Sequence, residues 1–183
     1  MRTGDEETRS PKYAHIERER RFLVDRARRP DLAGLAWVEI DDRYITGTRL
    51  RLRRMTDGAT GQVGLKLTKK YEADDPRARP IVTAYLDEAE YALFASLPAH
   101  RLVKRRYEVE TPGGMFGIDI FEGNLAGLEL AEIECPDDAT LNALVVPNWA
   151  MADVSDDIRF QGGRLSLCWP AGVAALLAEM AAR

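Results

Sequence analysis

The sequence contains few cysteine and histidine residues. Among 183 residues there are two cysteines, Cys135 and Cys168, and two histidines, His15 and His100. The cysteines are widely spaced and form no metal-ligand pattern, so we expect reduced thiols in a cytoplasmic protein. Neither histidine belongs to a ligand pattern, and both are expected at the surface.

The chain also lacks a long apolar run and an excess of positive charge. No hydrophobic stretch is long enough to cross a bilayer, and the charged N-terminus lacks the apolar centre of a signal peptide. We therefore expect no membrane association. The formal net charge is -4 with a pI of about 5.4, whereas nucleic-acid binders are usually basic, so nucleic acid is not an expected partner. This overall charge hides local clusters of bases.

What is present indicates one folded domain. Hydrophobic residues make up 45% and charged residues 31% of the chain, which is typical of a globular protein. Residues 1–12 are polar and are predicted to form a flexible tail, followed by a single domain over residues 13–183. Strands are expected at His15–Val24, Tyr44–Met55, Gln62–Lys69, Ile81–Leu86, Leu102–Glu110, Met115–Phe121 and Leu128–Cys135.

Few segments have helical spacing. Helices are predicted to begin near Asp87, Asp137 and Pro170, and Glu90 completes a capping-box pattern with Asp87. The apolar stripe of the first helix contains Leu93, Phe94 and Leu97. Many strands, short connections and few helices together predict an α+β fold with an antiparallel, barrel-like sheet.

Charged residues recur at alternate positions of several predicted strands. Side chains two apart in a strand share a face. The same-face sets are Glu17, Glu19 and Arg21; Arg49, Arg51 and Arg53; Lys104 and Arg106; and Glu132 and Glu134. One such strand would ordinarily have its charged face in water. Several strands with paired like charges fit better with a closed sheet that has a charged interior, where bases hold phosphates and carboxylates hold hard cations.

The order of these segments resembles the CYTH, or triphosphate tunnel metalloenzyme, superfamily. The resemblance extends from about Tyr13 to Leu165 and begins with a strand similar to the family's Glu-x-Glu-x-Lys motif. The matching segments are Ile16–Val24, Arg49–Arg53, Gly64–Leu67, Lys104–Tyr107, Gly117–Gly123, Gly127–Glu134 and Val154–Phe160.

The resemblance implies an eight-stranded antiparallel tunnel with helices packed outside, and divalent-metal-dependent hydrolysis of inorganic tripolyphosphate. Mg²⁺ or Mn²⁺ is the expected cofactor, and a small-molecule polyphosphate is the expected partner. The implied metal ligands are Glu17, Glu19, Glu132, Glu134, Asp119 and Asp157. The implied phosphate-binding residues are Arg51, Arg53, Lys66, Lys104, Arg106 and Arg159. The implied catalytic residues are Glu17, Glu19 and Arg21.

Arg21 is the clearest departure from the family pattern, which has lysine at this position. Lysine can lose a proton when its pKa is depressed, whereas arginine in a protein effectively cannot. Arg21 can therefore orient water, hold phosphate, or act as a structural ion-pair partner. Two alternatives to a tripolyphosphatase stay open: a polyanion-binding module without catalysis, and a class IV adenylyl cyclase or thiamine triphosphatase.

Several other residues are expected to be structural, and the oligomeric state is not predicted. Glu129 is expected at the surface. Trp37, Trp149 and Trp169 are expected to be packing residues.

Overall fold

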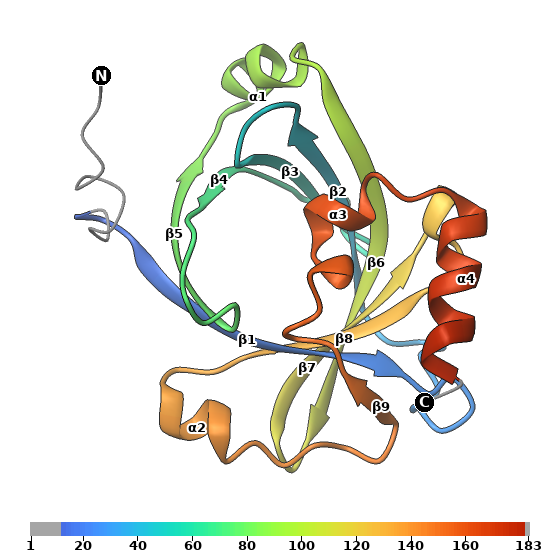
Figure 1. Ribbon diagram of the computed structural model, residues 1–183. Coiled ribbons are helices and arrows are strands. Elements are labelled where there is room, and N and C mark those ends of the chain that lie inside the picture. Colours follow the sequence, from blue (N-terminus) through green and yellow to red (C-terminus); the bar gives the residue numbers. More distant parts are fainter. Residues whose placement is uncertain (1–11, 182–183) are drawn as a thin grey trace.

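A single antiparallel sheet forms the framework of the computed structural model, which describes residues 12–181 (Figure 1). The predicted tail lies outside the described residues, apart from Lys12. The strands are β1 (His15–Val24), β2 (Trp37–Ile45), β3 (Leu50–Asp57), β4 (Val63–Lys70), β5 (Ala78–Tyr85), β6 (Ala99–Thr111), β7 (Gly114–Phe121), β8 (Glu129–Glu134) and β9 (Ala150–Asp153).

The sheet closes on itself through β1. The strand order is β5-β4-β3-β2-β6-β7-β8-β1-β9, and β1 also pairs with β5. Residues 15–18 of β1 pair with β5 and residues 19–23 pair with β8, which joins the two edges of the sheet. β9 pairs with the last three residues of β1. The predicted eight-stranded antiparallel tunnel is therefore confirmed, with β9 as an additional strand.

Helices lie outside or at one end of this barrel (Figure 1). They are α1 (Glu88–Ala95), α2 (Asp138–Asn142), α3 (Gly162–Leu165) and α4 (Pro170–Ala181), with 3-10 turns η1 (Gly123–Leu125) and η2 (Ile158–Phe160). No described helix is both long enough and apolar enough to cross a membrane.

The first helix has the predicted cap but not the predicted packing. Asp87 Oδ1 accepts a hydrogen bond from the Glu90 backbone at 2.8 Å, and Glu90 Oε2 accepts one from the Asp87 backbone at 2.9 Å. No residue of α1 is buried, and Leu93 is 72% exposed. The capping box is therefore confirmed, whereas the expected apolar stripe does not reach a core.

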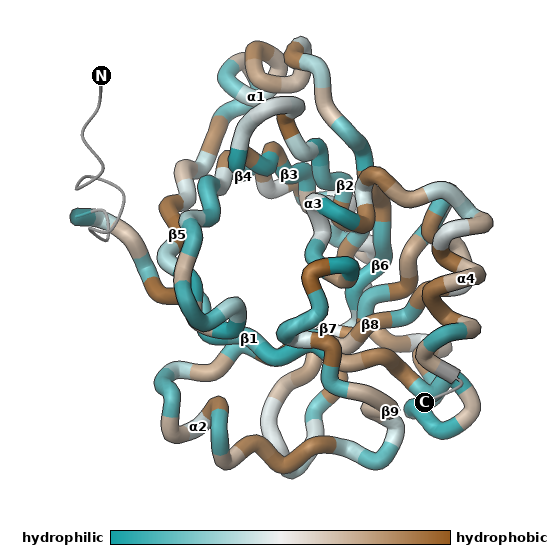
Figure 2. Tube along the Cα trace, in the orientation of Figure 1, coloured by the Kyte–Doolittle hydropathy of each residue, from teal (hydrophilic) through white to brown (hydrophobic). Residues whose placement is uncertain are grey.

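Two apolar clusters pack against the sheet. One contains Phe22, Phe116 and Trp149 and is covered by the segment that includes α2. The other joins side chains of β1, β6, β7 and β8 to the C-terminal helices through Phe160 and Val173. Figure 2 shows the apolar residues that run along α4 and follow α2. Strand alternation turns the second cluster toward the barrel interior, so apolar packing fills one end of the tunnel.

The expected strand over Tyr44–Met55 was wrong. This region contains the end of β2, a turn with Gly47 at φ 73°, and the start of β3. A left-handed backbone at Gly47 favours glycine and ends the strand. As a result, Arg49 lies outside β3, is exposed and pairs with Glu72. The strands β2 over Trp37–Ile45 and β9 were also missed, because neither carries a long uninterrupted β pattern.

Candidate active site

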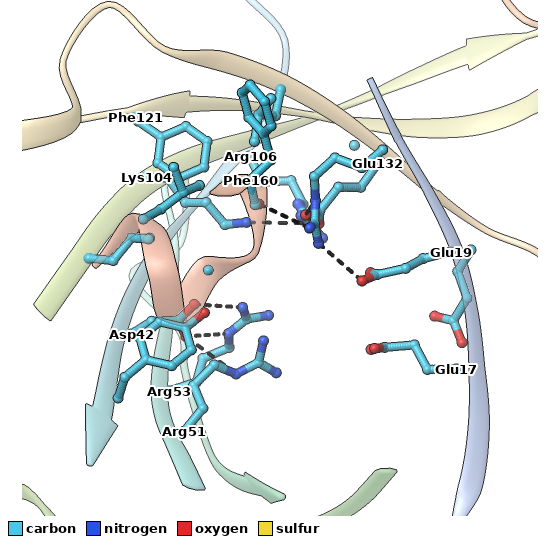
Figure 3. A pocket seen from close by; sticks show the side chains of 18 of the residues that line it. Glu17, Glu19, Asp42, Arg51, Arg53, Lys104, Arg106, Phe121, Glu132 and Phe160 are labelled. Atoms are coloured by element: carbon cyan, nitrogen blue, oxygen red, sulfur yellow. Dashed lines mark hydrogen bonds and ion pairs between the residues drawn. The ribbon is translucent and has the colours of Figure 1, made fainter. Parts of the chain in front are cut away.

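A cavity of about 220 Å³ lies inside the barrel (Figure 3). Its lining comes mainly from β1, β2, β3, β6, β7 and β8. Charged side chains from distant parts of the sequence therefore face one enclosed space. Figure 3 shows Arg51 and Arg53 on one side of that space and Glu17 and Glu19 on the other.

The buried carboxylate of Asp42 on β2 lies next to Arg51 and Arg53 on β3. Arg53 Nε and Nη2 donate hydrogen bonds to the two carboxylate oxygens of Asp42 at 2.6 and 2.8 Å. Asp42 is 1% exposed, and burial alone would raise its pKa, but Arg53 and Arg51 lower it to about 2. Arg51 Nε lies 3.7 Å from Asp42 and has no hydrogen-bond partner among the described residues. Arg53 is thus fixed by two bonds, while Arg51 keeps hydrogen-bonding capacity for a ligand.

A second group of bases lies on β6. Arg106 Nε and Nη2 donate to Asp119 at 2.7 and 2.6 Å, and Lys104 Nζ also donates to Asp119. Burial lowers the pKa of Lys104, although Asp119 and Glu132 oppose this effect. Gly117 faces Arg106, and a Cβ at this glycine would lie 3.0 Å from Arg106 Cδ and Nε. Glycine here therefore leaves space for the guanidinium.

Arg21 connects the acidic strands to the C-terminal segment. Its Nε donates to Glu132 at 2.8 Å, Nη2 to Glu19 at 3.0 Å, and Nη1 to the Phe160 carbonyl at 3.0 Å. Burial alone would lower the pKa of Arg21, but Glu132 and Glu19 raise it above its ordinary value. The guanidinium is therefore permanently charged and forms a hydrogen bond from each of its three nitrogens, which fits an ion-pair and positioning role.

The carboxylates of β1 have a second cationic partner. Lys70 on β4 donates to Glu17 and lies 3.5 Å from Glu19. Burial would raise the pKa of Glu19, but Lys70 and Arg21 lower it. Glu17 and Glu19 therefore enter the cavity as carboxylates that can exchange a protein ammonium for another cation.

The oxygen chemistry of the acidic strands suits a hard divalent cation, but the carboxylates do not form a complete cage. Among residues 12–181, no three His, Cys, Asp or Glu side chains converge closely enough to hold a metal ion. Glu134 pairs with His15 at 3.3 Å, and Glu132 is bound by Arg21 and Arg106. Mg²⁺ commonly binds one or two carboxylates together with substrate phosphates. Glu17 and Glu19 fit this mode.

Other implied site residues lie away from the cavity lining. Asp119 is completely buried behind Lys104 and Arg106. Asp157 and Arg159 pair with each other outside the cavity. Lys66 pairs in register with Arg53 but does not line the cavity. The ligand roles assigned to these four residues stay predictions without direct support from the cavity geometry.

Sequence reasoning missed several residues that line or support the site. Asp42 and Tyr44 come from β2, of which only the last two residues lay in an expected strand, and Lys70 comes from the last position of β4. Tyr44 approaches the backbone so closely that a Cβ on Gly162 would lie 1.9 Å from its hydroxyl. Glu108 lines the cavity two positions after Arg106. The alternation of β6 could have identified Glu108, whereas the contact between Tyr44 and Gly162 has no local signal.

Two smaller expectations were wrong, and two were confirmed. Glu129 is buried and pairs with Arg29 at 2.6 Å, because the loop after β1 folds over it, so a surface position was wrong. Trp169 is 72% exposed, so its expected packing role was wrong, whereas Trp149 is buried as expected. The exposed positions of both histidines are confirmed.

Comparisons with known proteins agree with this architecture. No family model matches the chain. An inorganic triphosphatase of Nitrosomonas europaea is 29% identical over 160 residues, covering 84% of this chain and 99% of the relative. A solved inorganic triphosphatase structure has a TM-score of 0.56 with 26% identity, covering 84% of this chain and 96% of the other.

A more distant likeness concerns the fold alone. A candidate adenylate cyclase from Bacillus halodurans has a TM-score of 0.51 with 14% identity, covering 72% of this chain and 86% of the other. The order of charged strands, the closed barrel and the triphosphatase relatives confirm the predicted resemblance. In its closed barrel and in the order of its charged strands, the chain resembles the CYTH, or triphosphate tunnel metalloenzyme, superfamily.

Proposed function

We propose that this protein hydrolyses inorganic tripolyphosphate with Mg²⁺ or Mn²⁺ as cofactor. The observation that carries the proposal is the convergence of bases from two separate strands on one enclosed cavity. Arg51 and Arg53 come from β3, and Lys104 and Arg106 come from β6. The activity named for the Nitrosomonas europaea relative, which aligns over 99% of its length, supports the same reaction.

The basic residues supply the phosphate-binding chemistry. Guanidinium groups form directional, charge-assisted hydrogen bonds to phosphate oxygens. Arg53 is oriented by Asp42, and Arg106 by Asp119, before any ligand arrives. Bases fixed in this way neutralise phosphate oxygens without reorganising, which favours the charge distribution of phosphoryl transfer.

The carboxylates of β1 supply the cation-binding chemistry. Glu17 and Glu19 would hold the divalent cation, and Lys70 would give up its contacts with them. The bound cation would add positive charge near the phosphate oxygens and lower the pKa of water. Arg21 would keep Glu19 and Glu132 in place, because its guanidinium contacts both carboxylates.

The size and lining of the cavity favour an inorganic substrate over a nucleotide. Its volume of about 220 Å³ is smaller than the roughly 300–1,000 Å³ of sites for drug-sized ligands. The phenylalanines in its lining, Phe121 and Phe160, are buried in the apolar cluster. They therefore offer no open platform for an adenine or thiamine ring.

A polyanion-binding module without catalysis is the second candidate. It is motivated by Arg21, whose three nitrogen positions are all engaged and which cannot accept a proton from water. Binding of tripolyphosphate without turnover would favour this candidate.

The decisive experiment compares tripolyphosphate, ATP and thiamine triphosphate with the same purified protein. Phosphate release and cyclic AMP formation are measured with Mg²⁺, with Mn²⁺, and with excess chelator, while calorimetry measures binding. We expect phosphate release chiefly from tripolyphosphate, its loss with chelator and its recovery with either metal. Full activity in chelator would contradict metal dependence, and cyclic AMP formation would indicate a cyclase.

A further inference from the structure

Strand β6 presents a graded series of charges to the cavity. Lys104, Arg106 and Glu108 occupy alternate positions and all three line the cavity. Consecutive members are separated by about 7 Å along the strand. Lys104 is 5% exposed, Arg106 is half-buried and Glu108 is exposed, so two bases are followed outward by an acid.

The cavity is closed beyond Lys104. Leu102, the preceding residue of this face, is buried together with Phe121 and Leu130 in the apolar cluster that continues to the C-terminal helices. These side chains form the lining at that end. A ligand that reaches Lys104 along β6 must therefore come from the direction of Glu108.

Glu108 is a carboxylate of the cavity lining that no guanidinium or ammonium neutralises. Within residues 12–181, Glu17, Glu19, Asp42 and Glu132 each contact a guanidinium or ammonium, and Glu134 pairs with His15, whereas Glu108 has no hydrogen bond or ion pair. The residue opposite Glu108 on β7 is Gly117, which has no side chain to cover it. The charge of Glu108 therefore acts on whatever occupies the outer part of the cavity.

We propose that Glu108 is a specificity-determining residue that limits the length of the polyphosphate chain. This inference rests on the proposed triphosphatase function. A linear triphosphate extends over a length similar to the spacing between Lys104 and Arg106, and both ends of that spacing carry positive charge. A fourth phosphoryl group would lie at the level of Glu108, where like charges repel. The next outward residue of the face, Glu110, has the same sign.

The test compares tripolyphosphate with tetrapolyphosphate in the parent protein and in Glu108→Gln. Glutamine keeps the shape of the side chain and removes its charge, and Glu108 is exposed, so the fold should persist. Removal of one repulsive charge at a solvent-exposed site should improve relative affinity for tetrapolyphosphate by roughly three- to tenfold at low salt, and less at high salt. Affinity for tripolyphosphate should change less than twofold.

Two controls separate this effect from a general change in charge. Glu88→Gln makes the same substitution on helix α1, away from the cavity lining, and should leave the ratio of affinities unchanged. ATP, measured as a competitor, has an uncharged ribose in place of the fourth phosphoryl group. Its affinity relative to tripolyphosphate should therefore stay within twofold in Glu108→Gln.

The outcomes distinguish this inference from the proposed function. If tripolyphosphate neither binds nor turns over in the parent protein, the proposed function fails. If tripolyphosphate is bound and the ratio of tetrapolyphosphate to tripolyphosphate affinity is the same in the parent and Glu108→Gln, the chain-length inference alone is wrong. An equal gain for all three ligands would also overturn it, because that result indicates only a change in overall attraction.

Discussion

The cavity has a basic side and an acidic side, and the buried charges of each side are paired with side chains of opposite charge. The number and kind of these counter-ions differ between the two sides. On the basic side, the four bases Arg51, Arg53, Lys104 and Arg106 contact the buried carboxylates Asp42 and Asp119. On the acidic side, Glu17, Glu19 and Glu132 contact Arg21 and Lys70. Burying a charge without a partner is costly, so each side carries counter-ions, and Arg106 also pairs with Glu132 across the two sides.

The two sides differ in the groups that can still bind a ligand. On the basic side, the Arg51 side chain has no hydrogen bond among the described residues, so a polyanion that contacts its guanidinium would improve its hydrogen bonding. The ammonium of Lys70, on a flexible chain, provides the only link to Glu17 among the described residues, and it can be exchanged. The basic side is thus organised in advance by forked hydrogen bonds, whereas Glu17 on the acidic side is held only by a point charge that a cation can replace.

The largest expected effect comes from removing bases. Arg106→Ala should weaken tripolyphosphate binding by about tenfold to a hundredfold, because a lost charged hydrogen bond is worth about 1.5–3 kcal/mol. Arg53→Lys should also weaken binding, since lysine keeps the charge but loses the fork to Asp42. Calorimetry at fixed salt and metal measures both variants and their combination, for which we expect non-additive losses.

Arg101→Ala is the matched control for this series, since Arg101 lies on β6 but is exposed and pairs with Asp41 outside the cavity. Circular dichroism must first establish folding. Parent-like affinity in both Arg106→Ala and Arg53→Lys would mean that the two strands do not grip one ligand.

On the acidic side, Glu17→Gln should reduce Mn²⁺ affinity by at least tenfold in the presence of tripolyphosphate, because glutamine cannot supply the carboxylate charge. Electron paramagnetic resonance of Mn²⁺ gives a readout that does not depend on turnover. Glu72→Gln is the control, since Glu72 is exposed and pairs only with Arg49 among the described residues. Unchanged Mn²⁺ affinity in Glu17→Gln would remove this residue from the proposed metal site.

Arg21→Lys tests the fixed counter-ion of the acidic side, because it replaces the guanidinium that contacts Glu19 and Glu132. A lysine cannot reproduce the three-directional contacts with Glu132, Glu19 and the Phe160 carbonyl. We expect a loss of about 1–3 kcal/mol in the free energy of unfolding, measured by urea denaturation. Increased turnover at alkaline pH with unchanged stability would instead indicate that the position needs a proton acceptor.

Asp42→Asn tests the buried counter-ion of the basic side. The pKa of Asp42 is about 2 in the folded protein, below its ordinary value of 3.8. A depressed pKa stabilises the fold above pH 3.8, and this contribution disappears as the pH falls toward 2. The free energy of unfolding of the parent should therefore exceed that of Asp42→Asn by roughly 2 kcal/mol at pH 7. This difference should become smaller below pH 4. A difference that is independent of pH would contradict this account.

The smallest expected effect is for Lys66→Ala. Lys66 lies beside Arg53 on β4 but outside the cavity lining, and its Nζ lies 5.3 Å from the centre of the Tyr85 ring. Burial, together with Arg53 and Arg51, lowers its pKa. We expect tripolyphosphate affinity to fall less than fivefold by calorimetry, since only a distant charge is removed. A loss as large as that of Arg106→Ala would place Lys66 in direct contact with the phosphates.

The sequence by itself determined which faces of the main strands are charged. Side chains alternate along a strand, so Glu17, Glu19 and Arg21 had to share one face, as did Arg51 and Arg53. The first strand was predicted with its observed bounds, and the capping box of α1 was identified from Asp87 and Glu90. These features depend on near neighbours, and local geometry is therefore enough to predict them.

Only the tertiary structure determined which basic side chain pairs with which acidic side chain. The fork between Arg53 and Asp42 needs the register of β2 against β3, and the bridge from Arg21 to Glu132 joins residues 111 positions apart. The closure of β1 onto β5 likewise brings Glu17 within reach of Lys70. Such pairings depend on strand order and register across the whole sheet, which no local pattern specifies. The alternation predicted a charged interior, and the closed sheet determined where its bases and acids face each other.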